Sequence, residues 1–196
     1  MQDFLKNTFL RYILNMLGTS MDSINKNQVE DNHENLSSEK AIDKIKDIVD
    51  KAKTCFFCTS VMTGSNTRPM SVQQVDVEGN LWFLSADDSH KNLELVQDPT
   101  VKLYFQGSAH SDFLQLDGIA TISKDRAKIE ELWQFVIGTW FTQGIDDPRI
   151  TVIKVKPTAG HYWDNKHGNA VAGIKILIGA ALHKTMDDSI EGKIEI

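Results

Sequence analysis

The first half of the chain alternates between helical and strand patterns of apolar residues. Residues 38–53 place one apolar side chain on each helical turn, with lysine and aspartate elsewhere, which predicts an amphipathic helix that starts at a serine cap. Residues 54–61 are rich in aromatic and β-branched side chains and predict a strand. Two further strands, 68–77 and 81–85, are joined by Glu78-Gly79-Asn80, a composition typical of a tight hairpin turn.

The pattern continues with a second helix and two more strands. The helix is predicted over residues 89–98, because the proline that follows disfavours helical backbone in the residue before it. Residues 101–106 alternate between apolar and polar side chains and predict a strand. Residues 113–123 predict another, in which Asp117-Gly118 indicates a bulge or a sharp bend.

The last predicted elements set the fold class. A third helix is expected to start at Ser123, followed by apolar residues with helical spacing at Ile129, Leu132, Trp133 and Val136. Residues 150–156 alternate and predict a strand that Pro157 ends, with one more strand over 158–163. About six strands with few helices predict a mixed α+β fold and favour a small closed antiparallel barrel over a doubly wound sheet.

The two ends of the chain stand apart from this pattern. Apolar residues between Phe4 and Leu17 have the spacing of one helix face, but charged residues interrupt them, so we expect neither a transmembrane span nor a signal peptide. The polar residues that follow lack periodicity and predict disorder. We therefore expect a disordered or non-native extension over 1–36, a folded domain over 37–164 and a C-terminal tail of uncertain order over 165–196.

Composition narrows the classes of partner. The chain has 196 residues, which suffices for one substantial core. Its formal net charge of -6 and the absence of a basic run argue against a general nucleic-acid binder. Two cysteines cannot form a disulfide framework, and a reducing compartment fits this content. We expect a cytoplasmic protein that binds neither nucleic acid nor a membrane.

The clearest candidate for chemistry is an anion site at the start of the second helix. Ser89 is a good N-cap after a buried strand, so backbone N–H groups point outward there. Lys91 in the first turn is unfavourable for the helix dipole, which indicates that an anion is expected. Arg68 lies on the strand that the hairpin pairs with this region. The three side chains could converge on one phosphate, although each alone is compatible with an ordinary surface position.

Other motifs are weaker evidence for a functional site. Cys55 and Cys58 form C-x-x-C, but three positions apart on a strand they point to opposite faces and cannot form a redox pair. The histidines show no metal-ligand spacing, and His161 and His167 are weak candidates, so we expect no metal. Trp82, Trp140 and Trp163 offer flat apolar surface for an aromatic ligand, although core packing is the commoner role.

Residues 38–163 resemble the general-stress-protein branch of the pyridoxamine-phosphate-oxidase-like split barrels. No single motif is specific, but the ordered set covers two thirds of the chain. The motifs are Arg68-Pro69-Met70-Ser71-Val72, Leu81-Trp82-Phe83-Leu84-Ser85, Ser89-His90-Lys91-Asn92-Leu93, Asp98-Pro99-Thr100-Val101, Leu116-Asp117-Gly118-Ile119-Ala120 and His161-Tyr162-Trp163-Asp164.

The resemblance implies a six-stranded antiparallel Greek-key split barrel with flanking helices. Such a barrel forms a homodimer and binds FMN, or FAD in some members, at the subunit interface. Lys91 would belong to the basic pair that holds the phosphate, with His90 in place of an arginine, and Trp163 would reach the flavin of the partner subunit. The implied cofactor-binding residues are Arg68, Met70, Gln73, Leu84, Ser85, Ser89, His90, Lys91 and Trp163.

Departures from the pattern limit the functional expectation. Residues 164–196 contain no arginine, so the arginine and histidine that recognise pyridoxal phosphate in the oxidase have no counterpart. Phe113 also stands where the oxidase has a flavin-contacting glutamine. We therefore expect a flavin-dependent oxidoreductase linked to stress responses, of unknown substrate, rather than a pyridoxamine-phosphate oxidase. The alternatives are a non-catalytic flavin carrier or sensor and a haem-binding barrel with His90, His110 or His161 as ligand.

Overall fold

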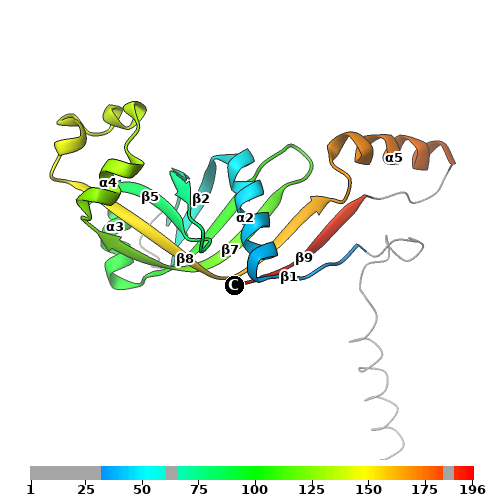
Figure 1. Cartoon of the computed structure of the whole chain (residues 1–196), viewed down its shortest axis with the longest axis horizontal. Coiled ribbons are helices and arrows are strands. Elements are labelled where there is room, and N and C mark those ends of the chain that lie inside the picture. Colours follow the sequence, from blue (N-terminus) through cyan, green and yellow to red (C-terminus); the bar gives the residue numbers. More distant parts are fainter. Residues whose placement is uncertain (1–31, 61–65, 183–187) are drawn as a thin grey trace, which may run out of the picture.

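The computed structural model describes residues 32–60, 66–182 and 188–196, and in it one sheet dominates a mixed α+β fold (Figure 1). The mixed class agrees with the prediction. In chain order the elements are β1 (Leu36–Ser37), α2 (Ser38–Ala52), β2 (Thr54–Thr59), β3 (Thr67–Ser71), β4 (Gln74–Val75), β5 (Leu81–Ala86), α3 (His90–Gln97), β6 (Thr100–Gln106), β7 (Phe113–Ser123), α4 (Arg126–Leu132), two 3-10 helices (Phe135–Thr139 and Gly144–Asp146), β8 (Ile150–Asn165), α5 (Asn169–Leu182) and β9 (Ser189–Glu195).

The sheet is organised around β8, a strand of 16 residues. Hydrogen-bonded neighbours follow the order β1-β9-β8-β7-β6-β2-β3, and β5 pairs with both β4 and β8. Along one edge of β8, β7 pairs with nearly the whole strand. Along the other edge, β5 pairs with residues 150–155 and β9 with residues 160–165. The length of β8 therefore lets one strand join two parts of the sheet.

The strand predicted over 68–77 is divided into β3 and β4. The backbone N–H of Val72 donates to the Lys53 carbonyl at 3.0 Å, which continues the pairing with β2. The N–H of the next residue, Gln73, donates to the Trp82 carbonyl at 2.8 Å, which begins the pairing with β5. Within two residues the chain thus changes its hydrogen-bond partner from β2 to β5. This change explains why a single continuous strand was the wrong prediction.

The predicted bulge at Asp117-Gly118 is confirmed by a register shift between β7 and β8 at that point. A Cβ at Gly118 would lie 2.7 Å from Val155 Cγ1, so only glycine allows β8 to approach this closely. The prediction that Pro157 ends its strand is wrong, because β8 runs through it to Asn165. Pro157 is the pairing partner of Gly118, and an irregular ladder tolerates a residue without an N–H donor.

The third helix begins later than predicted. Ser123 is the last residue of β7, and the N-cap of α4 is Asp125, whose carboxylate accepts from the backbone N–H of Lys128 at 3.2 Å. The α-helix ends at Leu132, with Trp133 as its C-cap, and a 3-10 helix follows. The side chain of Val136 lies outside the described part of the structure. The apolar spacing thus extended over two short helices rather than one.

Two apolar clusters hold these elements together. The larger fills the space between α2 and the sheet and includes Ile45, Phe57, Phe83, Leu103 and Leu116, each of which is fully buried. The smaller joins α4 and the segment after it to β8 through Ile129, Leu132, Ile137, Phe141, Ile150 and Val152. Trp82, Leu84 and Ala86 of β5 pack against this cluster. Ile45 lies on the apolar face predicted from the sequence of α2, so that face supplies part of the larger cluster.

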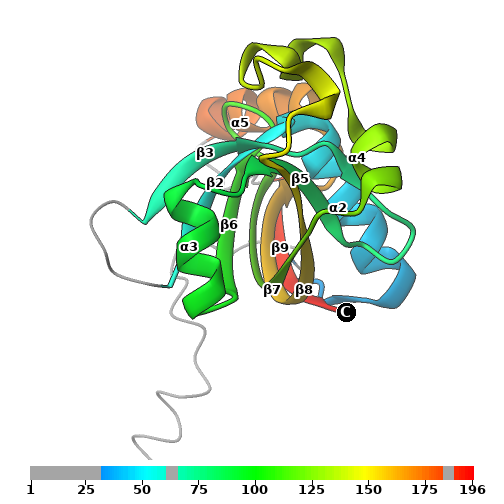
Figure 2. The same cartoon turned by 90° about the vertical axis from the view of Figure 1, so that its left-hand side faces the viewer.

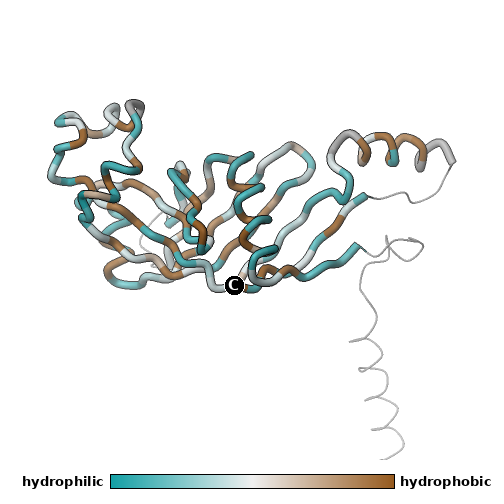
Figure 3. The backbone as a smooth tube through the Cα atoms, viewed as in Figure 1, coloured by the Kyte–Doolittle hydropathy of each residue, from teal (hydrophilic) through white to brown (hydrophobic). Residues whose placement is uncertain are grey.

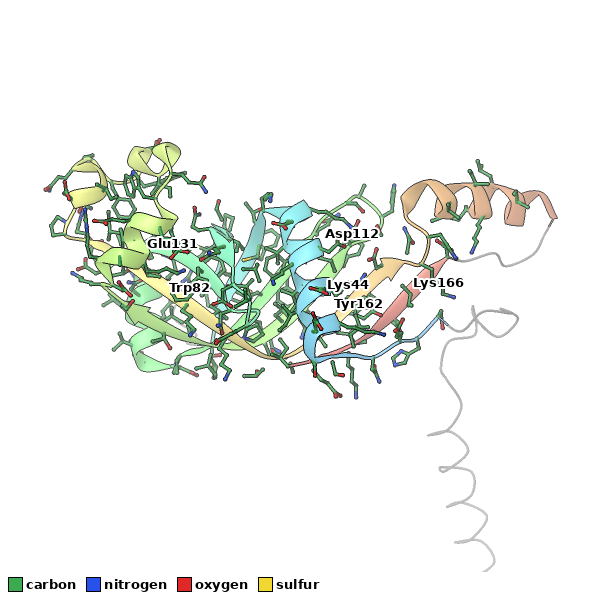
Figure 4. The ribbon with its side chains drawn as sticks, viewed as in Figure 1. Lys44, Trp82, Asp112, Glu131, Tyr162 and Lys166 are labelled. Carbon is green, nitrogen blue, oxygen red and sulfur yellow. The ribbon has the colours of Figure 1, made fainter. Side chains whose placement is uncertain are left out.

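Ion pairs fix α2 to β8 and to the connection between β6 and β7. Lys44 Nζ lies 2.8 Å from Asp164 Oδ2 and 5.3 Å from the centre of the Tyr162 ring. Lys51 Nζ lies 2.7 Å from Asp112 Oδ1, in the connection between β6 and β7. Figure 4 shows Lys44 beside Tyr162 and Asp112 further along the same side of the molecule.

The described residues on both sides of the predicted folded domain also join the sheet. β9 pairs with residues 160–165 of β8, and β1 pairs in parallel with β9, so residues 32–37 run beside the C-terminal strand. Between β8 and β9, α5 lies apart from the rest of the sheet at the end of the molecule opposite α4 (Figure 1). Figure 3 shows that α5 is largely apolar. Within the described ranges, none of the helices is long and apolar enough to cross a membrane.

Candidate functional site

The site forms where β5 ends and α3 begins. β5 ends at Ala86, and Ser89 caps α3 by accepting a hydrogen bond from the backbone N–H of Asn92 at 3.3 Å. Asp98 is the C-cap, directly before the proline that the sequence predicted as the helix end. The strand, turn and helix are therefore those expected from sequence, and they place Lys91 in the first helical turn.

Lys91 points inward rather than into solvent and is only 9% exposed. Its ammonium group donates to the hydroxyl of Ser85 and, at 3.3 Å, to that of Ser89. The Ser85 hydroxyl donates to Asn92 Oδ1 at 2.8 Å, and the amide of Asn92 donates to Thr151 Oγ1 at 2.8 Å. A network of buried polar groups thus ties Lys91 to β5, α3 and β8, as buried charges require.

Arg68 approaches the same place from β3. Its Nη1 atom lies 2.7 Å from Oε2 of Glu94, whose side chain is 5% exposed. The same carboxylate oxygen accepts from the hydroxyl of Thr59 at 2.6 Å. The guanidinium remains partly accessible, with 20% of the side chain exposed. Figure 2 shows α3 lying beside β2 and β3, the strands that supply Thr59 and Arg68.

The electrostatics of the cluster follow from this burial. Burial and the nearby positive charge of Arg68 lower the pKa of Lys91 to about 8, and the charge of Glu94 acts in the opposite direction. Burial would raise the pKa of Glu94, but hydrogen bonds from Arg68 and Thr59 hold it below its usual value. At neutral pH the group comprises two cations and one carboxylate. Its net positive charge suits an anion.

Of the predicted residues, Lys91 contacts Ser85 and Ser89, and the charge of Arg68 acts on Lys91, so the structure brings the four into one neighbourhood. Their convergence on a phosphate stays a prediction. Sequence reasoning did not identify Glu94 or Thr59. Glu94 lies three residues after Lys91 on the same helix, a spacing that places two side chains on one face, so this signal was available. Thr59 could not be found in this way, because only the packing of α3 against β2 brings it there.

The other predicted cofactor-binding residues lie outside this cluster. Met70 packs against the main core, and Leu84 packs against the smaller one. His90 is exposed at the start of α3. Gln73 lines a cavity of about 460 Å³ together with Trp140, Ser71 and Gln134. Trp163 lines a second cavity, described below.

That second cavity has a volume of about 540 Å³ and a largely aromatic lining that includes Phe56, Tyr104, Phe113 and Trp163. Phe56, Tyr104 and Trp163 are 58%, 41% and 40% exposed, respectively, although they are large apolar side chains. His161 packs against Trp163 with ring centres 4.4 Å apart. An exposed aromatic surface of this kind is typical of an interaction site.

Trp82 does not offer a free aromatic face. The ammonium group of Lys128 lies 4.3 Å from the centre of its ring, and that of Lys154 lies 5.5 Å away. The indole N–H donates to Asp76 Oδ2 at 2.9 Å. Figure 4 shows Trp82 close to Glu131, a residue that pairs with Lys128 at 2.9 Å. This tryptophan therefore serves the packing of α4 on β5.

The cysteines behave as predicted for strand positions. Cys55 is buried and Cys58 is half-buried, and both are free thiols on β2. Burial raises the pKa of the Cys55 thiol, which makes it a poor nucleophile. C-x-x-C redox chemistry therefore has no support here.

Comparison with known proteins assigns the chain to a family. The model of the family described as pyridoxamine 5'-phosphate oxidase like matches residues 40–187. The chain belongs to the pyridoxamine 5'-phosphate oxidase-like family. It is 29% identical over 91 residues to the protein bli-3 of Neurospora crassa, a match that covers 42% of this chain and 44% of that protein. The match thus spans less than half the length of this curated relative.

Three solved structures have a similar fold. A general stress protein 26 candidate from Jannaschia sp. has a TM-score of 0.62 at 22% identity, over 81% of this chain and 96% of that one. A Clostridium acetobutylicum protein related to general stress protein 26 has a TM-score of 0.54 at 25% identity, over 64% and 89%. The general stress FMN/FAD binding protein of Xanthomonas citri has a TM-score of 0.54 at 20% identity, over 61% and 85%. The resemblance to the general-stress-protein branch is thus confirmed.

Proposed function

We propose that this member of the pyridoxamine 5'-phosphate oxidase-like family binds a flavin nucleotide, FMN or FAD, with a phosphate group at Arg68, Ser85, Ser89 and Lys91. The observation that carries the proposal is the buried ammonium group of Lys91 beside the Arg68 guanidinium at a helix N-terminus. Arg68 pairs with the Glu94 carboxylate, whereas among the described residues Lys91 donates only to the hydroxyls of Ser85 and Ser89, so a phosphate would supply the missing negative charge. The Xanthomonas citri relative of this fold, an FMN/FAD binding protein by name, supports the same ligand class.

The rest of the flavin has a suitable path. β3 is the end strand of the hydrogen-bonded order, so one of its edges has no described neighbour. Gln73 lies five positions after Arg68, and five extended residues span about 16 Å, so one flavin nucleotide would reach from Arg68 to Gln73. Gln73 and Trp140 line a cavity that would hold the ring system. Met70, Leu84 and His90 would complete the surroundings of the bound flavin.

We further propose that the sheet is the six-stranded antiparallel split barrel of the family. Its strands would be β2, β3 continued by β4, β5, β8, β7 and β6. The support is the hydrogen bonding at Val72 and Gln73, which links β2 through β3 and β4 to β5, while β8, β7 and β6 lead back to β2.

A homodimer is the assembly that we propose for this barrel. Phe56, Tyr104 and Trp163 form an exposed aromatic surface around a cavity, and a second copy of the chain would cover it. Trp163 would then approach the flavin bound to the partner subunit. The surface is thus the structural support for placing the flavin at the subunit interface.

The proposed activity is that of a flavin-dependent oxidoreductase of a small molecule in stress responses. The bound flavin would supply the redox chemistry, and the chain would anchor the phosphate, orient the ring and limit access of water. Pyridoxamine phosphate is not the proposed substrate, because residues 164–196 contain no arginine to bind its phosphate.

The test begins with the absorbance spectrum of the purified protein and identification of any chromophore released on denaturation. We expect flavin peaks, and either bound FMN or FAD or uptake of added FMN. A protein that neither carries nor takes up a flavin would refute the proposal. Reduction of the bound flavin by NADH or NADPH, followed by reoxidation with an acceptor, would support the enzyme, whereas a flavin that resists both donors would favour a carrier or sensor.

A further inference from the structure

Glu94 occupies an unusual place in the candidate site. It is a buried carboxylate inside a cluster that otherwise suits an anion. Its Oε2 atom accepts hydrogen bonds from Arg68 at 2.7 Å and from Thr59 at 2.6 Å, and its side chain is 5% exposed. An anion that merely competed with phosphate for Arg68 would be expected at the surface, where it could swing away. The second bond, from β2, holds Glu94 in place instead.

We propose that Glu94 is a positioning residue of the phosphate site, which fixes the Arg68 guanidinium against α3 and balances the positive charges of Arg68 and Lys91. This inference rests on the proposed binding of a flavin phosphate. Glu94 itself would not touch the phosphate. It would act through the two cations, one held by a direct hydrogen bond and the other three residues away on the same helix.

The charge balance matters because Lys91 is buried. Burial and the charge of Arg68 both favour the neutral amine, and Glu94 favours the ammonium ion that a phosphate needs. The Lys91 pKa of about 8 is therefore the result of opposing effects, and it leaves the ammonium form dominant at neutral pH. Arg68 from β3 and Glu94 from α3 are the charged groups that shift it, and His90 acts on Glu94 from the first turn of α3. Ser85 and Ser89 contribute neutral hydroxyls.

The experiment compares the wild type with Glu94→Gln, which keeps an oxygen that can accept from Arg68 and Thr59 but removes the charge. The Lys91 amine is titrated by ¹³C NMR in the flavin-free protein, and the affinities for FMN and riboflavin are measured between pH 6 and 10. We expect the Lys91 titration to move to lower pH by about one unit in Glu94→Gln. The pH at which FMN affinity begins to fall should move by a similar amount, while riboflavin binding should show no such shift.

Two further variants separate charge from structure. Thr59→Val removes the second hydrogen bond but keeps the carboxylate, so the Lys91 titration should stay at the wild-type pH. Arg68→Met removes the opposing cation, so the same titration should move to higher pH. Should Glu94→Gln fail to fold, Glu94→Asp, whose shorter stem withdraws the charge, should lower the Lys91 titration by a smaller amount.

The outcomes distinguish this inference from the proposed function. An unchanged Lys91 titration in Glu94→Gln, or an equal shift in Thr59→Val, would overturn the role of Glu94 even if FMN binds. A uniform gain in FMN affinity at every pH would also overturn it, because Glu94 would then only repel phosphate. A wild type that binds neither flavin would refute the proposed function, whereas the NMR titration would still decide whether Glu94 supports the charge of Lys91.

Discussion

The phosphate-anchoring role of Lys91 leads to a quantitative prediction. Lys91→Met removes the ammonium group and keeps a side chain of similar length. A charge-assisted hydrogen bond contributes about 1.5–3 kcal/mol, so FMN affinity at pH 7 should fall by about 10- to 150-fold. Riboflavin lacks the phosphate, and its affinity should change by less than about threefold. The ratio of the two affinities, measured by quenching of flavin fluorescence, is therefore the informative quantity.

Burial makes this substitution a clean one. Lys91 is 9% exposed, and a methionine there avoids the cost of burying a charge. Ser85 and Ser89 keep Asn92 as a hydrogen-bond partner when the amine is removed. We therefore expect the free energy of unfolding at pH 7 to stay within about 1 kcal/mol of the wild-type value.

The pH dependence provides an internal check. Because the Lys91 pKa is about 8, the wild type progressively loses the ammonium form above that pH, and its FMN affinity should fall toward that of Lys91→Met by pH 9.5. Lys128→Met is the matched control, since the Lys128 side chain is 15% exposed and its ammonium group lies over Trp82 rather than in the proposed phosphate site. An equal loss of FMN and riboflavin affinity in Lys91→Met, or a loss of the same size in the control, would refute the reasoning.

Three further predictions concern assembly and stability. Phe56→Glu should dissociate the proposed dimer in analytical ultracentrifugation, whereas Val77→Glu, at a position 83% exposed, should not; an intact Phe56→Glu dimer would contradict the proposed interface. Gly118→Ala should lower the free energy of unfolding in urea by about 1–3 kcal/mol, because the new Cβ would meet Val155 Cγ1 at 2.7 Å. Gly173→Ala has open space around it in α5 and should raise the free energy of unfolding by about 0.5–1 kcal/mol. Asp188 is buried, yet hydrogen bonds from its neighbours hold its pKa at about 2, so its stabilising effect should be lost between pH 4 and 2, and Asp188→Asn should remove that part of the acid sensitivity.

The candidate site was predictable where it depended on one local segment. The cap at Ser89, the cation in the first turn and the helix end before Pro99 all follow from neighbouring residues, and the structure has them as expected. Glu94 was also within reach, because it shares a helix face with Lys91. The direction of the Lys91 side chain was not predictable. The local sequence is the same whether a lysine at this position points into solvent or into the protein. Only the packing of α3 on β2, β5 and β8 decides which of the two occurs.

The sequence by itself determined the class of the fold, most helix and strand positions, the bulge at Asp117-Gly118 and the family, because each depends on local backbone preference or on an ordered set of short motifs. Tertiary structure decided the rest. The switch of partner at Val72 and the run of β8 through Pro157 depend on which strand lies opposite, and sequence periodicity contains no information about that neighbour. The joining of residues 189–195 to the sheet as β9 depends on the long β8 edge that receives them. Hydrogen bonds between distant strands, rather than propensity, fixed these features.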